Sequence, residues 1–327
     1  MRLLRILTWN THGSYLYYLS QLPHELYIMT KPGRPRGYGG RCADRAWGPN
    51  VHEIEVNAAR HAQFDCILFQ HPMQYLEDQY LYLSAAQRAL PQIFLEHEPP
   101  RVNPTETRHP VDDKNVLLIH VTPYNQLMWD NRHQSSRLIE HGVPVPAEVH
   151  YTGERASGLV VAHCLGRRGR GGGADIFRQV ADSVELELVG LESRAFGGLG
   201  EIAHAKLPAF AAQFRFLFSP LRYTGLNLAV IEAMMIGMPV IGLATTEMAS
   251  VIQNGVSGFV DTDIHKLIAH MHALLRDPHY ALALGRGAQR HACERFGMRR
   301  FLAEWNAALQ LVTDTRAHKT RTLSSVT

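Results

Sequence analysis

Cysteine is scarce in this 327-residue sequence: the four cysteines are scattered and form no CxxC pair. Neither a disulfide framework nor a zinc site is indicated, and a reduced cytoplasmic setting fits best. No apolar stretch approaches the roughly 18 to 20 uninterrupted residues that a membrane span needs. The run 2–9 is too short and too charged for the hydrophobic region of a signal peptide, so we expect a first buried strand there.

An excess of charge of one sign is also lacking. The 33 basic and 30 acidic residues leave a net charge of +3, which argues against a nucleic-acid-binding protein. No GxGxxG follows a predicted strand with an acidic residue about 20 residues later, so a Rossmann oxidoreductase is not indicated. The remaining composition is globular, 46% hydrophobic and 19% charged, and the length suits about two domains.

Short apolar runs alternate with helical patterns along the chain, which predicts an α/β fold of parallel sheets with helices on both faces. Strands are expected at residues 3–9, 25–29, 66–70, 92–96, 116–121, 158–162, 186–189, 214–218, 239–243 and 258–260. Helices are expected at residues 75–89, 174–182, 205–213, 226–236, 262–276 and 278–296.

The domain boundary is best placed in the segment 143–147, where two prolines in four residues favour an extended linker. This predicts a first Rossmann-like domain over residues 1–146 and a second over 147–297. A helical pattern with one apolar stripe follows over 298–312. The polar residues 313–327 lack periodicity and are expected to be flexible.

The most informative segment runs from residue 219 to 242, where a strand, a loop and an apolar helix follow one another. Loop amides and a helix N-terminus at the carboxyl end of a parallel strand make an anion site. Glu232 is the only charged residue in the helical run 226–236. Two interpretations remain open for this carboxylate: a structural pair with an arginine, or acceptance of two hydroxyl hydrogen bonds, as from a ribose.

This region contains three short motifs at characteristic spacing: Glu232-Ala-Met, Gly237-Met-Pro-Val, and the turn 254–260. Their joint spacing resembles the donor-binding signature of retaining GT-B glycosyltransferases of the group 1 (GT4-type) class. The resemblance implies two Rossmann-like domains whose parallel sheets face a cleft, and it assigns the nucleotide ribose to Glu232. It also implies that backbone amides hold the donor diphosphate. These amides would be those of Gly225, Leu226, Asn227 and Leu228.

The sequence departs from this family at two places. Thr224, a candidate catalytic residue, stands where the family has a first glutamate that contacts the donor sugar. Its hydroxyl can still hydrogen-bond a sugar hydroxyl, but it brings no charge. The family's diphosphate clamp, an arginine followed by a lysine, corresponds here to a glycine-rich stretch with arginines only. We expect Arg167 and Arg170 to form the clamp, with Arg168 as the competitor and a solvated loop as the alternative.

In the first half, Gly13 and Ser14 lie in the segment that follows the first strand. A glycine there either lets the backbone approach a ligand or simply forms a turn. His71 and His97 each follow a predicted strand, and both are candidate catalytic residues. In the family a histidine after the strand that matches 66–70 lies beside the reacting sugar, so His71 is the closer match. The basic loop 31–45 is expected to be a mobile flap that is either simply solvated or grips an anionic acceptor or membrane surface.

The resemblance implies a hexosyltransferase-type enzyme that transfers sugar, with retention and without metal, from a nucleotide-diphosphate-sugar donor. The acceptor would be a saccharide, a lipid-linked compound or another hydroxyl compound, and no separate cofactor or nucleic acid is expected. A cytoplasmic location is expected, with peripheral contact at the inner membrane face left open. The alternative is a nucleotide-sugar-binding protein with weak or no transfer. The family's last helix packs back on the first domain, so we expect Trp305 to be buried there; a helix packed on the second domain is the alternative.

Overall fold

The structure is a computed structural model that describes residues 2–324, with the surroundings of side chains described up to residue 314. The chain forms two compact units. The first unit comprises the residues up to Gly142 together with those from Arg299 onward, and the second unit comprises Val143–Met298. The first division therefore falls four residues before the boundary predicted at 146/147, and the second falls one residue after the boundary predicted at 297/298.

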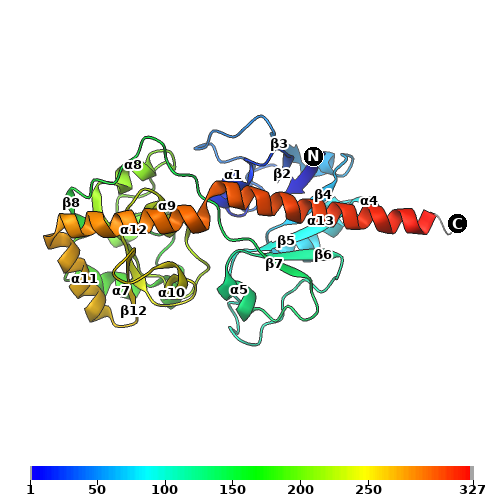
Figure 1. Cartoon of the computed structure of the whole chain (residues 1–327). Coiled ribbons are helices and arrows are strands. Elements are labelled where there is room, and N and C mark those ends of the chain that lie inside the picture. Colours follow the sequence, from blue (N-terminus) through cyan, green and yellow to red (C-terminus); the bar gives the residue numbers. More distant parts are fainter. Residues whose placement is uncertain (1, 325–327) are drawn as a thin grey trace. The chain divides into compact units, whose positions relative to one another are not determined.

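The first unit is built on a seven-stranded sheet in the order β3-β2-β1-β4-β5-β6-β7, and every neighbouring pair is parallel. Its interior contains stacked aromatic side chains, among them Trp9 and Phe69, which are fully buried. The strands are β1 (Arg5–Thr8), β2 (Glu25–Thr30), β3 (Val51–Glu55), β4 (Cys66–Phe69), β5 (Gln92–Glu96), β6 (Val116–His120) and β7 (Ser136–Leu138) (Figure 1).

The helix predicted over 75–89 is not continuous. A π-helix over Gln74–Asp78 passes into α3 (Gln79–Tyr82), and Leu83 then adopts an extended conformation that ends the helical run. Ser84 restarts it as the N-cap of α4 (Ala85–Arg88), with a capping box to Gln87. The other helices of this unit are α1 (Gly13–Leu19), α2 (Val56–Ala59), α5 (Pro123–Met128) and α13 (Met298–Ser324).

The C-terminal helix α13 packs within the first unit. Figure 1 shows it beside α1, and Trp305 Nε1 donates a hydrogen bond of 3.0 Å to Tyr15 Oη. Trp305 and Phe301 are fully buried, and a Cβ at Gly142 would lie 2.3 Å from the Phe301 side chain. The helix continues to Ser324, so the break expected at residue 312 is absent; the last three residues of the expected flexible tail lie outside the described part.

The basic loop 31–45 is packed rather than loose. The Lys31 ammonium lies 3.6 Å from the ring centroid of Tyr38, which is itself buried. Arg34 forms a two-pronged ion pair with Glu53, and this pair lowers the pKa of the Glu53 carboxyl. The flap predicted from its glycine and proline content is thus held against the body of the first unit.

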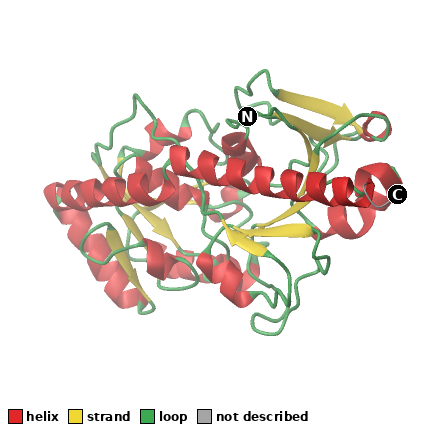
Figure 2. Cartoon of the chain, turned by 45° about the vertical axis from the view of Figure 1, so that its right-hand side comes forward, coloured by secondary structure: helices red, strands yellow, loops and turns green. Residues whose placement is uncertain are grey.

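The second unit has a five-stranded parallel sheet in the order β12-β11-β10-β8-β9. In each unit the strands, yellow in Figure 2, lie among helices drawn in red. The strands are β8 (Arg155–Val161), β9 (Leu186–Val189), β10 (Phe214–Ser219), β11 (Val240–Leu243) and β12 (Gly258–Asp261). The helices are α6 (Gly169–Gly172), α7 (Ala174–Ala181), the 3-10 turn η2 (Ser193–Phe196), α8 (Leu207–Ala211), α9 (Leu228–Met235), α10 (Met248–Val251), α11 (Ile264–Arg276) and α12 (Pro278–Phe296).

A buried arginine ties the amino end of the second sheet together. Arg215 in β10 is 6% exposed and donates hydrogen bonds to the carbonyl oxygens of Gly153, Leu274 and Leu275 at 2.7 to 2.9 Å. These carbonyls belong to the segment before β8 and to the end of α11, so one guanidinium supplies hydrogen-bond donors to both segments.

Within the described residues, no helix is both long enough and apolar enough to cross a membrane.

Candidate functional site

The second unit has a topological switch point between β8 and β10. These strands are neighbours in the sheet, but the chain proceeds from β8 to β9 on one side before it returns to β10 on the other. The loops that follow them therefore diverge, and ligands in open parallel sheets bind at such a place, beyond the carboxyl ends of the strands. The segment between β8 and α7, which includes α6, carries the three candidate arginines, and the loop after β10 carries Thr224.

The two loops are locked to each other by backbone contacts. Gly173 has a φ of +75°, and a Cβ there would lie 1.9 Å from the carbonyl oxygen of Pro220, so this position requires glycine. The amides of Arg222 and Tyr223 both donate to the carbonyl oxygen of Gly171, at 2.9 and 3.2 Å. The glycine run is therefore the surface on which the loop after β10 rests.

An ion pair fixes the same junction. Both Nη atoms of Arg222 donate to the Asp175 carboxylate, at 2.6 and 2.7 Å. The Arg222 guanidinium lowers the pKa of Asp175 to about 2. This carboxylate at the start of α7 is therefore ionised at neutral pH and holds the loop after β10 in register.

The structure separates the three candidate arginines. Arg167 is exposed and pairs with Glu192, and Arg170 is exposed and lies 3.3 Å from an Asp175 oxygen. The Arg168 side chain reaches the loop after β10, where its Nη2 donates a hydrogen bond of 3.1 Å to Thr224 Oγ1. The residue treated as the competitor in the sequence is thus the one whose side chain is hydrogen-bonded to Thr224.

Asn227 and Glu232 lie on the helix that follows. Asn227 caps α9 through its Oδ1, which accepts from the Ala229 amide at 3.1 Å. Glu232 is partly buried, and one of its carboxylate oxygens lies 3.5 Å from His204 Nε2. Gly225 and Leu226 are buried in the loop, and Leu228 is the first helical residue.

His163 extends this group of charges. Desolvation lowers its pKa most strongly, while Glu201 and Glu232 oppose this effect and Arg168 adds to it. Arg168 and Glu232 therefore act electrostatically on the same imidazole, at the end of β8. The available signal for His163 in the sequence was its place directly after a predicted strand.

The first unit has its own switch point, between β1 and β4. His97, which follows the neighbouring strand β5, is buried there, and its Nε2 lies 3.2 Å from Gln70 Oε1. Its ring lies against His12, with 4.0 Å between centroids, and meets the Tyr15 ring edge-on. Desolvation lowers the pKa of His12 to about 4 and that of His97 well below its usual value, so both imidazoles are neutral at pH 7.

His71 has a different environment. Its ring is exposed, and Nδ1 accepts a hydrogen bond of 3.2 Å from the Met73 amide. His71 acts electrostatically on His12, so the structure brings His71, His12 and His97 to one edge of the sheet. His12 was missed in the sequence, where its position between the first strand and Gly13 was the available signal.

Gly13 and Ser14 lie at the start of α1, beside the packed basic loop. A Cβ at Gly13 would lie 3.0 Å from Cys42 Sγ, and Ser14 Oγ accepts a hydrogen bond of 3.0 Å from Arg45 Nη2. Arg45 also lies over the Tyr17 ring. Both predicted residues therefore contact the loop 31–45.

No group of three or more histidine, cysteine or carboxylate residues in the described part of the chain is arranged to hold a metal ion. Metal independence stays a prediction.

Comparisons with known proteins bear on both units. Residues 171–277 match the family model described as glycosyl transferases group 1. No curated protein matches the sequence significantly. The solved sucrose-phosphate synthase of Thermosynechococcus elongatus is similar over 100% of both chains, with a TM-score of 0.69 and 16% identity.

Two further solved structures are similar over most of the chain. HepE of Anabaena, solved with UDP and glucose, is 12% identical, with a TM-score of 0.66 over 94% of this chain and 99% of its own. The lipopolysaccharide outer core galactosyltransferase WaaB is also 12% identical, with a TM-score of 0.62 over 93% of this chain and 98% of its own. The chain therefore has the GT-B glycosyltransferase fold of two Rossmann-like units and carries the glycosyl transferases group 1 segment in its second unit.

Proposed function

We propose that the protein is a glycosyltransferase that moves a hexose from a nucleotide-diphosphate-sugar donor to a hydroxyl acceptor, with retention and without a metal ion. The observation that carries the proposal is the Arg168–Thr224 hydrogen bond at the β8/β10 switch point, beside Glu232. Thr224 and Glu232 lie in the segment that matches the group 1 family model, and Arg168 lies just before it. UDP is the nucleotide named for the HepE structure, so it is the first probe to use.

In the proposed reaction, the second unit stabilises the leaving nucleoside diphosphate. Arg168 supplies a guanidinium with fork geometry for phosphate oxygens, and the amides from Gly225 to Leu228 stand at the N-terminus of α9. Such preorganised donors stabilise developing negative charge without a proton transfer. Glu232 accepts the ribose hydroxyl hydrogen bonds, and Thr224 contacts the donor sugar through its hydroxyl.

The first unit supplies the acceptor side of the proposal. The neutral imidazoles of His12 and His97 offer hydrogen bonds to a hydroxyl group without adding a charge. A saccharide acceptor suits this polar, uncharged pair. Gly13 and Ser14 are proposed as further contacts because they end the same switch-point loop.

Glu232→Ala is expected to weaken UDP binding by about 1.5 to 3 kcal/mol, the value of hydrogen bonds to a charged group. Isothermal titration calorimetry measures this change, with Glu185→Ala as a control because Glu185 is exposed and lies before β9. A folded Glu232→Ala protein that binds UDP as tightly as the parent would remove the ribose role.

Arg168→Ala is expected to reduce affinity for UDP about tenfold or more and to leave affinity for uridine nearly unchanged, because only UDP carries the diphosphate. The double change of Arg167 and Arg170 to alanine is the matched comparison. Its effect should be smaller, because both guanidiniums pair with carboxylates of this unit. The reverse order of effects would restore the clamp predicted from the sequence.

A nucleotide-sugar-binding protein with little transfer is the second candidate. Thr224, in place of a glutamate, favours it, because the hydroxyl that replaces the carboxylate is already bonded to Arg168. A panel of nucleotide sugars, followed by thermal shift and by release of free nucleotide, separates the two functions. Stabilisation without nucleotide release, with and without added saccharides, supports the binding protein.

A further inference from the structure

A hollow of about 500 Å³ lies in the first unit, away from its histidine cluster. Arg5 opens β1 and Asp65 immediately precedes β4, so this hollow is at the amino ends of the strands. His12 and His71 follow the carboxyl ends of the same two strands. The hollow therefore belongs to the opposite edge of the sheet and plays no part in the proposed transfer reaction.

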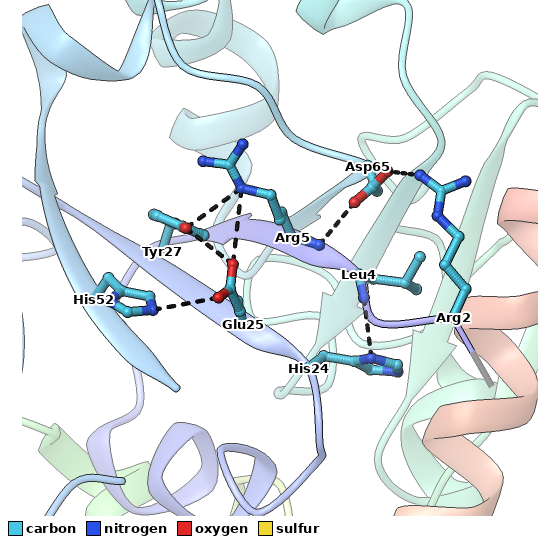
Figure 3. A network of polar contacts seen from close by, with 8 residues as sticks. All are labelled: Arg2, Leu4, Arg5, His24, Glu25, Tyr27, His52 and Asp65. Atoms are coloured by element: carbon cyan, nitrogen blue, oxygen red, sulfur yellow. Dashed lines mark hydrogen bonds and ion pairs between the residues drawn. The ribbon is translucent and has the colours of Figure 1, made fainter. Parts of the chain in front are cut away.

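The ionisable residues that line the hollow are three arginines and one acid: Arg2, Arg5, Arg60 and Asp65. The acid is already engaged, because one Asp65 oxygen pairs with Arg2 and the other accepts the Arg5 amide at 2.9 Å (Figure 3). The lining thus has an excess of two positive charges over its carboxylate.

Arg5 is held in place by groups behind the lining. Its Nε lies 3.3 Å from Tyr27 Oη and 3.8 Å from a Glu25 oxygen. Glu25 in turn accepts from Tyr27 at 3.0 Å and lies 4.0 Å from His52 Nε2 (Figure 3). These contacts fix the guanidinium through one nitrogen and stack it on Tyr27.

Several guanidinium donors at the hollow remain available. Within the described residues, nothing accepts a hydrogen bond from Nη1 or Nη2 of Arg5. Among the described residues, Arg60 donates only through Nη1, in a long contact of 3.4 Å with the Leu81 carbonyl oxygen. Two arginines that line one hollow, each with unused paired donors, have the geometry that recognises a tetrahedral oxyanion.

We propose that this hollow binds a phosphate monoester. The two guanidinium groups supply paired N–H donors for phosphate oxygens, and the volume exceeds what phosphate alone requires, leaving room for a small organic group. Phe64 and Leu90 provide apolar lining for that group, and Gln63 and Ser84 provide polar lining.

The test is titration of the full chain with glycerol 3-phosphate and with inorganic phosphate, by isothermal titration calorimetry. Arg60→Gln should raise the dissociation constant about tenfold or more. Arg60 is exposed, so this variant keeps the fold, and Arg5→Gln provides the second variant. Arg88→Gln is the control: Arg88 lies on α4 and donates to the Leu83 carbonyl oxygen, outside the lining.

A second arm distinguishes a free ester from a lipid headgroup. Phosphatidylcholine vesicles with and without phosphatidic acid are sedimented with the same variants. Binding of either probe that falls in Arg60→Gln and Arg5→Gln, but not in Arg88→Gln, supports the site and names its source. Binding of neither probe, or binding lost in Arg168→Ala and unchanged in Arg60→Gln, overturns the proposal.

Discussion

Trp305→Ala is expected to lower the free energy of unfolding by about 3 to 5 kcal/mol, as for other buried aromatic side chains cut to alanine. Trp305 is fully buried in the first unit, against Tyr15 and Phe301. The change removes an indole from a closed core and leaves Tyr15 Oη without the hydrogen bond from Nε1. Urea denaturation followed by circular dichroism measures the loss.

Trp305→Phe is the matched variant, because it keeps an aromatic ring and removes the hydrogen bond to Tyr15. It should cost clearly less than the alanine change, roughly 1 kcal/mol for the bond plus the volume lost. A Trp305→Ala protein as stable as the parent would show that α13 contributes little to the first unit.

His97→Ala is expected to lower kcat and kcat/KM together by about 100-fold while UDP affinity stays the same. The reason is that a positioned hydrogen-bonding group in a desolvated site acts mainly in the transition state. The His97 ring is buried and held by Gln70, His12 and Tyr15. Transfer assays and UDP titration on the same preparation separate the two effects, and thermal unfolding checks the fold.

His71→Ala is the comparison. The resemblance to group 1 enzymes favours His71. Its ring is exposed, however, so water competes with the substrate for hydrogen bonds to the imidazole. We therefore expect a smaller loss of turnover than for His97. An inactive His71→Ala protein beside a fully active His97→Ala protein would reverse this order and restore the assignment from the sequence.

Sequence patterns predicted well those elements whose ends carry strong local signals. The helix expected at 278–296 has these bounds in the structure, because Asp277 caps it, Pro278 opens it and Gly297 follows it. The apolar strands at the centre of each sheet were also predicted within a few residues. The edge strand β3 was not, because Glu53 and Glu55 break its apolar pattern.

The candidate site shows a second limit. Neighbouring residues in a helical turn point about 100° apart. Which of the neighbouring arginines faces the loop after β10 therefore depends on a single step along the chain. Gly169 and Gly173 have φ values of +57° and +75°, and these positive angles set the path of α6 and the side on which Arg168 emerges. Composition and spacing contain no information about those angles. The pairing of Arg167 with Glu192 likewise joins segments 25 residues apart.

The route of the chain also has a consequence for biosynthesis. The second unit is one continuous segment, whereas the first unit needs residues from both ends of the chain. During translation, the core beside the sheet of the first 142 residues cannot be completed until Phe301 and Trp305 have been synthesised. All residues of the second unit are therefore synthesised before Phe301 and Trp305, which complete the core of the first unit. A ribosome that stalls near residue 297 would present an unfinished hydrophobic surface to chaperones and proteases.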